Sequence, residues 1–360
     1  MESTGGGAVQ KDGAFERASA FLLAQADGQF AEVRHAMIFD RAAGFTAPTE
    51  KQSSDIFARA TLANLFLDIA ASMPTAELAA AFRAIARREA EYLARAKIAG
   101  RTGGWSYFPD LPELPPDADS LAAAISLFAR TAPEYLDLCR EPASIVLAGA
   151  GADGSLETWI VGPADAPSDQ ARMQWAIRTF WGSGSDPDVL ANLYYALWLW
   201  EPDRYAEAIR RGASKLMEMQ QPNGTWRATW YVGPAYGTAL SVRLLRAAGV
   251  GDDARLRAHQ FFLDTQREDG SWRDGSATPL ETALSMTALS DAAPRSGLSA
   301  MRRGAAALQE LQLADGSWLP SPWIQMEIGR AVGHIFNVLT YQSVTLTTAF
   351  CLRALLLAGS

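Results

Sequence analysis

The chain has 360 residues, of which 49% are hydrophobic and 20% charged, the balance of an ordinary globular protein with a large core. Its formal net charge of −8, with no basic cluster to offset the acids, argues against a nucleic-acid partner. The two cysteines, Cys139 and Cys351, lie far apart, so we expect no disulfide framework and a reducing, cytoplasmic location.

Residues 1–12 are expected to form a flexible tail without the features of a signal peptide, and residues 13–360 a single domain. No stretch approaches the ~18 uninterrupted apolar residues of a membrane-spanning helix, so we expect no transmembrane segment. Peripheral membrane contact and the oligomeric state are left open.

A helical pattern fills the rest of the chain, because Ala, Leu and Arg dominate between Gly, Pro and Asp. Twelve helices are predicted, over residues 13–25, 54–73, 75–97, 117–131, 168–181, 187–200, 203–219, 234–249, 252–266, 279–292, 297–312 and 339–358. One short strand hairpin is expected from residues 144–151 and 156–162. Amphipathic helices alternate with helices that are apolar on every face, and the latter must be buried on every face.

A repeated motif, Gln-x-x-x-Gly-x-Trp, occurs three times at a spacing of 46 residues, at 220–226, 266–272 and 312–318. Weaker relatives lie at 25–30, 101–107 and 151–159. The Gly suits a turn with positive φ, and the Gln amide can satisfy free backbone groups at neighbouring helix ends. We therefore expect the motif to hold adjacent helical hairpins together and to have no catalytic role.

Twelve helices of two alternating kinds make six helical hairpins. If the hairpins close into a ring, the amphipathic helices form an outer layer and the apolar helices an inner one. The sequence thus predicts an all-α fold, a single (α/α)6 toroid.

The Gln-x-x-x-Gly-x-Trp repeats resemble the QW motifs of squalene–hopene cyclases and related class II terpene cyclases, of the prenyltransferase and squalene oxidase repeat superfamily. The resemblance implies a cytoplasmic enzyme of isoprenoid biosynthesis, a terpene cyclase of the isomerase or lyase type. It would take a small apolar isoprenoid or prenyl diphosphate and begin the reaction with a proton.

Four of the six starts of the predicted inner helices carry acids, and in a ring of this kind these starts share one mouth. The acids are Asp55, Asp117, Asp119, Asp186, Asp188 and Glu281. Each is a good N-cap or first-turn residue, which is a sufficient structural explanation. Two of the starts nevertheless carry a doubled Asp-x-Asp, which a single cap does not require, and crowded acids in a dry cavity retain protons.

Class II cyclases carry a D-x-D-D motif in which the middle acid protonates the substrate. By that resemblance, Asp117 in "PPDADSLAAAI" matches the first acid, Asp119 the proton donor, and Ser120 replaces the last Asp. Asn192, a polar residue in an apolar run, is expected to face the cavity or a helix end.

Aromatic residues on the inner helices and mouth loops are candidates to line an apolar cavity and to stabilise a carbocation. They are Phe57, Phe66, Tyr194, Tyr195, Trp198, Tyr231, Tyr236, Trp323, Tyr341 and Phe350. Any one of them is more simply explained as core, and the prediction concerns the set.

Other functions have weaker support in the sequence. The three histidines have no metal-ligand spacing, so no metal site is predicted and no cofactor is required; Mg²⁺ is conceivable if the substrate carries a diphosphate. An inverting glycosidase, with Asp119 and Asp188 as its acid and base, is an alternative on the same fold. A non-catalytic isoprenoid-binding or scaffold protein is another.

Overall fold

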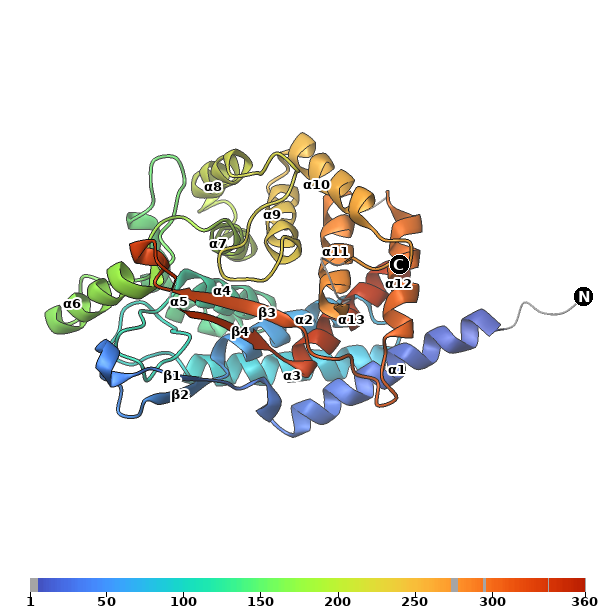
Figure 1. Ribbon diagram of the computed structural model, residues 1–360, viewed down its shortest axis with the longest axis horizontal. Helices are drawn as coiled ribbons and strands as arrows, with labels where there is room; N and C mark the ends of the chain where they lie inside the picture. The colour runs from blue at the N-terminus through green and yellow to red at the C-terminus, as the bar shows by residue number, and fades with distance from the viewer. Residues whose placement is uncertain (1–5, 273–277, 294–295, 336, 360) are drawn as a thin grey trace, which may run out of the picture.

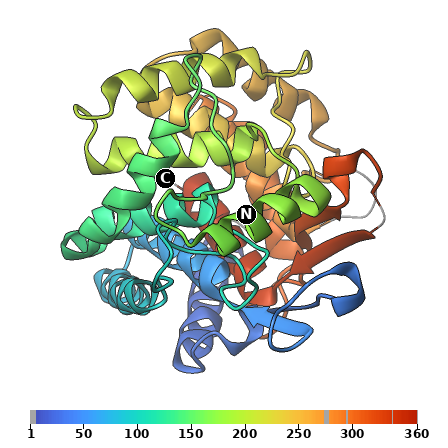
Figure 2. The same cartoon turned by 90° about the vertical axis from the view of Figure 1, so that its left-hand side faces the viewer.

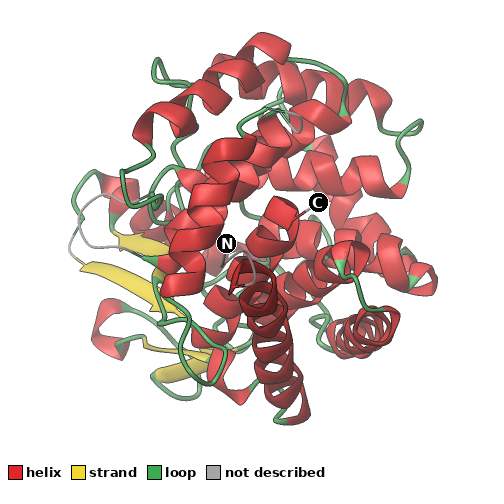
Figure 3. Ribbon diagram, turned by 90° about the vertical axis from the view of Figure 1, so that its right-hand side faces the viewer, coloured by secondary structure: helices red, strands yellow, loops and turns green. Residues whose placement is uncertain are grey.

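Helices dominate the chain, and the computed structural model describes residues 6–272, 278–293, 296–335 and 337–359 of it. Within these residues two short antiparallel hairpins supply the strands (Figure 3). No described helix combines the length and the hydropathy needed to cross a bilayer.

Six helices form the inner ring. They are α2 (Ile56–Ser72), α4 (Ala118–Thr131), α7 (Pro187–Trp200), α9 (Ala235–Ala247), α11 (Pro279–Ala292) and α13 (Val344–Gly359). Each contacts the next in this order, and α13 contacts α2, so the ring is closed (Figure 1). Burial on every face explains their composition: in α4, every side chain from Ala118 to Phe128 is buried.

Six further helices form the outer layer: α1 (Gly6–Asp27), α3 (Ala76–Arg95), α5 (Asp137–Ala148), α8 (Ala206–Glu218), α10 (Asp252–Thr265) and α12 (Leu298–Glu310). They are amphipathic; α8, for example, buries only Ile209, Gly212, Ala213 and Leu216. Five outer helices directly follow their inner partners, whereas α1 packs on α13 and so completes the sixth hairpin with the far end of the chain. The predicted (α/α)6 toroid is confirmed.

The Gln-x-x-x-Gly-x-Trp turns connect neighbouring outer helices, as predicted. The Gln266 amide donates to the carbonyl of Gly270 in its own turn (2.9 Å) and to that of Ala300 in the next outer helix (2.8 Å), while its oxygen accepts from Arg303. Gly270 has φ +82°, and a Cβ there would lie 2.4 Å from the Arg303 carbonyl oxygen, which explains the glycine. Gln312 makes the equivalent bond to Ala14 of α1 and closes the outer ring.

Two predicted elements near α4 and α5 are wrong. Residues 144–148 belong to α5 and not to a strand, and α5 was missed because Pro142 interrupts its pattern. The predicted helix 168–181 exists as α6 (Pro167–Ala176) and a π-helical turn, Ile177–Trp181, but it does not belong to the ring (Figure 2).

Two hairpins at the N-terminal ends of inner helices were also missed. Strands β1 (His35–Ile38) and β2 (Lys51–Ser54) precede α2. Strands β3 (Pro322–Ile328) and β4 (Asn337–Gln342) precede α13, so the predicted helix 339–358 begins five residues too early.

The predicted tail over residues 1–12 lies partly outside the described residues, and residues 6–12 belong to α1. The assignment of residues 13–360 to one domain stays a prediction. Both cysteines, Cys139 and Cys351, are free and buried.

Candidate active site

The start of α4 places two carboxylates at the N-terminal mouth of the ring. Asp117 is the N-cap and accepts hydrogen bonds from the backbone N–H (2.6 Å) and the hydroxyl (2.9 Å) of Ser120. Asp119 lies in the first turn and points to other elements. Ser120 therefore serves Asp117, and its hydroxyl makes no hydrogen bond to the predicted proton donor.

Asp119 is held by residues from two other segments. The Asn192 amide on α7 donates to one carboxylate oxygen at 2.5 Å, and the Tyr231 hydroxyl donates to the other. Asn192 in turn accepts from Arg243 of α9 at 3.0 Å. Both carboxylate oxygens have a partner, so the side chain has a fixed orientation.

Burial disfavours the charged forms of Asp117 and Asp119. It raises the pKa of Asp119, although the hydrogen bonds from Tyr231 and Asn192 and the charge of Arg243 lower it. Burial also raises the pKa of Asp117 to about 7, with a smaller contribution from Asp119. Both side chains are only 7% exposed.

A largely apolar pocket adjoins the two acids. Its wall consists of Phe39, Phe57, Tyr107, Phe108, Leu114, Thr158, Trp159, Trp181, Val189, Trp230, Tyr231, Ile324 and Met326, with Asp117 and Asp119. Most of these residues are aromatic, and most lie in the hairpins and loops of the mouth. The free space is about 60 Å³, well below the roughly 300–1,000 Å³ of a small-molecule site, so an isoprenoid chain requires some of these side chains to move.

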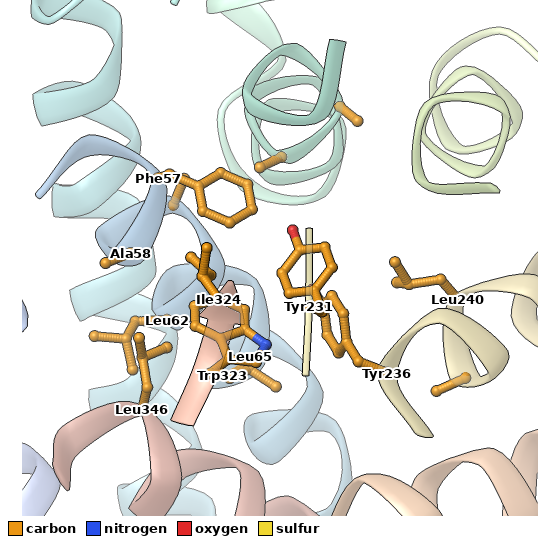
Figure 4. Close-up of a cluster of buried hydrophobic side chains, with 14 of the residues drawn as sticks. Phe57, Ala58, Leu62, Leu65, Tyr231, Tyr236, Leu240, Trp323, Ile324 and Leu346 are labelled. Atoms are coloured by element: carbon orange, nitrogen blue, oxygen red, sulfur yellow. The ribbon is translucent and has the colours of Figure 1, made fainter. Parts of the chain in front are cut away.

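Beside this pocket, Phe57, Tyr231, Tyr236 and Trp323 belong to a cluster of buried hydrophobic side chains (Figure 4). Trp323 of β3 stacks on Phe57 (ring centroids 5.9 Å apart) and also contacts Tyr231, Tyr236 and Phe350. The apolar pocket that adjoins Asp119 thus lies at the mouth, next to this aromatic cluster.

The second Asp-x-Asp, at the start of α7, holds a loop. Asp188 is fully buried and accepts from the backbone N–H groups of Thr229 and Trp230 (3.2 and 3.3 Å). Asp186 accepts from the Thr229 hydroxyl and the Trp230 indole N–H, and pairs with Arg330 at 3.3 Å. Burial, then Asp186 and Asp119, raise the pKa of Asp188 to about 7.

Two predicted acids lie away from the pocket. Asp55 accepts from Tyr92 (2.5 Å) and pairs with Arg34 and Arg59 at 3.5 and 3.7 Å. Glu281 lies in the first turn of α11, beside a different surface hollow. Neither residue lines the wall around Asp119.

The predicted aromatics other than Tyr341 divide into four groups. Phe57 and Tyr231 line the mouth pocket, and Trp323 stacks on Phe57. Tyr195, Trp198, Tyr236 and Phe350 line a second pocket at the opposite mouth. Phe66 and Tyr194 face the outer layer instead, because Phe66 packs on Phe82 and the Tyr194 hydroxyl donates to Gly154.

The predicted Tyr341 belongs to a buried cluster beside the pocket. Its ring packs on His35 (4.8 Å) and its hydroxyl donates to the Val33 carbonyl (2.7 Å). His35 Nδ1 lies 2.9 Å from the Tyr107 hydroxyl, and burial lowers the pKa of His35 to about 4, so the imidazole is neutral. Sequence reasoning had assigned no role to this His–Tyr pair.

Other contacts in the site also had no sequence signal. Tyr231 was a candidate for the wall but not for the hydrogen bond to Asp119, because the two residues lie 112 positions apart. Arg243 had the appearance of a solvated helix residue. In the described part of the chain, no three His, Cys, Asp or Glu side chains are arranged to hold a metal ion.

Comparison with known proteins supports the resemblance first seen in the repeats. Residues 184–350 match the family model of the squalene-hopene cyclase C-terminal domain. An ent-copalyl diphosphate synthase of Streptomyces sp. (strain KO-3988) is 40% identical over 109 residues, which are 29% of this chain and 21% of that protein. The squalene–hopene cyclase of Alicyclobacillus acidocaldarius is 33% identical over 155 residues, 38% of this chain and 24% of that protein. The chain is thus class II terpene cyclase-like, and its matches span about a quarter or less of these relatives.

One solved structure extends the comparison to the whole fold. A variant of the type II terpene cyclase MstE from Scytonema, in complex with geranylgeranyl dihydroxybenzoate as substrate, has a TM-score of 0.66 and 17% identity. The match covers 97% of this chain and 97% of that one. That likeness shows the fold alone, in a chain of similar size.

Proposed function

We propose that this chain is a class II, proton-initiated terpene cyclase in which Asp119 protonates an isoprenoid. The observation that carries the proposal is the position of Asp119. It is a buried acid with a raised pKa in the wall of an otherwise apolar, aromatic pocket. Burial of this kind favours the protonated form of a carboxyl, which a proton donor needs.

In the proposed first step, the Asp119 O–H bond breaks and the proton forms a C–H bond at the less substituted carbon of a terminal alkene. The π electrons of that alkene form the new bond, which leaves a tertiary cation on the neighbouring carbon. A second alkene of the same chain attacks the cation and closes a ring. The reaction ends when the last cation loses a proton to a solvent water molecule, and Asp119 regains a proton from solvent, so that substrate and product are isomers.

The surroundings of Asp119 suit the charges of this reaction. The rings of Phe57, Trp159 and Trp230 present π electrons that stabilise a cation, and the apolar wall keeps water from capturing it. The carboxylate that remains is stabilised by its hydrogen bonds from Asn192 and Tyr231.

The substrate is proposed to be a small apolar isoprenoid or a prenyl diphosphate. Curated relatives include copalyl diphosphate synthases, and a solved neighbour is described with a geranylgeranyl substrate. Because the proton donor is a side chain, no resident cofactor is proposed. Mg²⁺ enters only as the counter-ion of a diphosphate. A cytoplasmic location, expected from the free thiols, is part of the proposal.

The glycosidase alternative is disfavoured by the position of Asp188. An inverting glycosidase needs a second carboxylate that can activate a water molecule in the pocket. Asp188 is 0% exposed, does not line the pocket, and accepts from the backbone N–H groups of Thr229 and Trp230.

The experiment is incubation with squalene and with geranyl, farnesyl and geranylgeranyl diphosphates, followed by mass spectrometry of the products. Wild type should yield a cyclic isomer from at least one of them. Asp119→Asn should lose at least about 10³-fold in rate, because the amide has no proton of comparable acidity to give.

Asp55→Asn is the matched control, since Asp55 is equally buried at another inner-helix start but lies off the pocket. It should retain turnover. Equal rates for wild type and Asp119→Asn would remove Asp119 as the donor. If the protein binds isoprenoids but converts none of them, the result would support the alternative of a non-catalytic isoprenoid-binding protein.

A further inference from the structure

A second pocket opens at the opposite mouth of the ring, where the inner helices end. All six inner helices contribute side chains to it, and its free space is about 280 Å³, several times that of the aromatic pocket. Its charged lining consists of Arg130, Arg243, Arg246, Arg353, Asp68 and Asp291. Four guanidinium groups thus face two carboxylates.

Three of the arginines are paired. Arg130 and Arg353 both bind Asp68, at 2.6 and 3.0 Å, and Arg246 binds Asp291 at 2.9 Å. Cations at helix C-termini are also favoured by the helix dipole, which is a sufficient structural explanation for residues of the last turn.

Arg243 is not explained in that way. Its guanidinium lies over the Tyr195 ring, 4.1 Å from the centroid, and donates to Asn192, and no described carboxylate lies within ion-pair distance. Its Nε is buried without a hydrogen-bond partner, and so is the Ser126 hydroxyl in the same wall. Because buried polar atoms are nearly always partnered, these groups have capacity for a polar ligand.

We propose that this pocket binds a diphosphate group. A diphosphate presents several oxygens to several guanidinium forks at once, a geometry that Arg matches better than any other side chain. With four arginines and two aspartates, the lining favours an anion, and a metal cation would compete with the arginines already bound to Asp68.

The pocket is connected to the candidate proton donor through a single residue. Arg243 donates to the Asn192 oxygen (3.0 Å), and the Asn192 nitrogen donates to Asp119 (2.5 Å). The positive charge of Arg243 lowers the pKa of Asp119, so an anion beside Arg243 would offset that influence and help Asp119 keep its proton.

The diphosphate has two sources, free inorganic pyrophosphate and the head group of a prenyl diphosphate. Only the second rests on the proposed cyclisation. The sources are distinguished by titrating the full-length protein calorimetrically with pyrophosphate, with geranylgeranyl diphosphate and with geranylgeraniol, the neutral alcohol.

Arg243→Gln and Arg246→Gln should each raise the Kd of the diphosphate ligand at least tenfold. Arg246 lies at the rim and is half-exposed, so its variant tests the pocket without opening the interior. Arg210→Gln, an exposed arginine of α8 paired with Glu207, is the control and should leave the Kd unchanged. Circular dichroism melting verifies that each variant is folded.

Each outcome has one meaning. Pyrophosphate binding that depends on Arg243 assigns the site to a diphosphate as such, and binding only of geranylgeranyl diphosphate with the same dependence assigns it to the head group. No binding of either ligand, or equal binding by wild type and both pocket variants, overturns the proposal. Asp119→Asn removes a carboxyl that interacts electrostatically with Arg243, so by reciprocal coupling it should bind diphosphate at least as tightly as wild type. A wild-type protein that binds diphosphate and forms no cyclic product would refute the cyclisation and leave this site standing.

Discussion

The two mouths of the toroid differ in their ionisable side chains: carboxyl groups gather at the N-terminal mouth and arginines at the C-terminal one. At the N-terminal mouth the helix dipoles favour anionic carboxylates, by about 0.3–1 kcal/mol for each. Burial raises the pKa of Asp117 to about 7, some three units above an ordinary aspartate, which corresponds to about 4 kcal/mol against the charged form. At Asp117, desolvation therefore outweighs the dipole and favours the neutral acid.

At the C-terminal mouth, carboxylates pair with three of the four arginines. The difference between the mouths thus comes from what surrounds the helix ends. Loops rich in aromatic residues seal the acidic mouth, whereas inner-helix side chains alone line the basic one. A reaction that begins with a proton and a site that holds an anion fit these two environments.

Trp323→Ala should have the largest effect on stability, because Trp323 separates the two mouths. The indole is 2% exposed and contacts Phe57 on one side and Phe350 on the other. Its removal should lower the free energy of unfolding by about 3–5 kcal/mol and join the two pockets. Urea denaturation measures the loss.

Leu319→Ala is the control, since Leu319 is 61% exposed near the same hairpin, and it should change stability by less than about 0.5 kcal/mol. A loss of under about 1 kcal/mol for Trp323→Ala would mean that the centre is loosely packed.

Asn192→Leu should break the connection between the mouths. It removes one donor from Asp119 and the acceptor of Arg243, at a cost of about 1–3 kcal/mol for the buried groups left unpaired. Since the Asn192 hydrogen bond lowers the pKa of Asp119, its loss should raise that pKa. The decline of turnover at high pH should then move to higher pH in a pH–rate profile. An unshifted profile would show that Asn192 does not act on the donor.

Most of the ring could be predicted from the sequence, because each inner helix is apolar throughout and begins at a polar residue or proline. The three strong repeats also predicted the bonds between outer helices. Pro142 obscured α5, although the weak motif at 151–159 follows that helix and was the available signal.

The candidate site was less accessible to such reasoning. The acids at α4 and α7 are visible in sequence, but the partners that distinguish them are not. Tyr231, in a loop, donates a hydrogen bond to Asp119. Trp230 in the same loop donates hydrogen bonds to Asp186 and Asp188. Those pairings depend on how loops far apart in the chain fold over one mouth, and no local pattern encodes them.

The pH dependence of stability should distinguish Asp188 from an ordinary carboxylate. Its pKa of about 7 in the folded protein exceeds the value of about 3.9 in an unfolded chain, so the native state binds more protons between these values. Stability from this group is complete below about pH 4 and is lost as the pH rises to about 7, by at most about 1.4 kcal/mol per pH unit.

Asp188→Asn removes that titration, so the stability of the variant relative to wild type should increase from pH 4 to 7 and stay constant above. Chemical denaturation at several pH values measures the difference. The hydroxyl of Ser317 lowers the pKa of exposed Asp315, so Asp315→Asn should show no such trend in this window. A constant difference between wild type and Asp188→Asn would contradict the raised pKa.

Ser120→Ala should have the smallest effect on stability and turnover. Ser120 stands where the D-x-D-D motif has its last Asp, and the variant tests the role of this serine. The Ser120 hydroxyl bonds to Asp117 at 2.9 Å and makes no hydrogen bond to Asp119. Its loss should cost about 0.5–1.5 kcal/mol of stability and raise the pKa of Asp117, because that hydrogen bond favours the charged form. Turnover should remain within about threefold of wild type, since the partners of Asp119 are untouched. A tenfold or larger fall in kcat, with stability retained, would mean that Ser120 acts on the proton donor. Because Ser120 bonds to Asp117, the carboxyl groups of Asp117 and Asp119 would then act as a coupled pair.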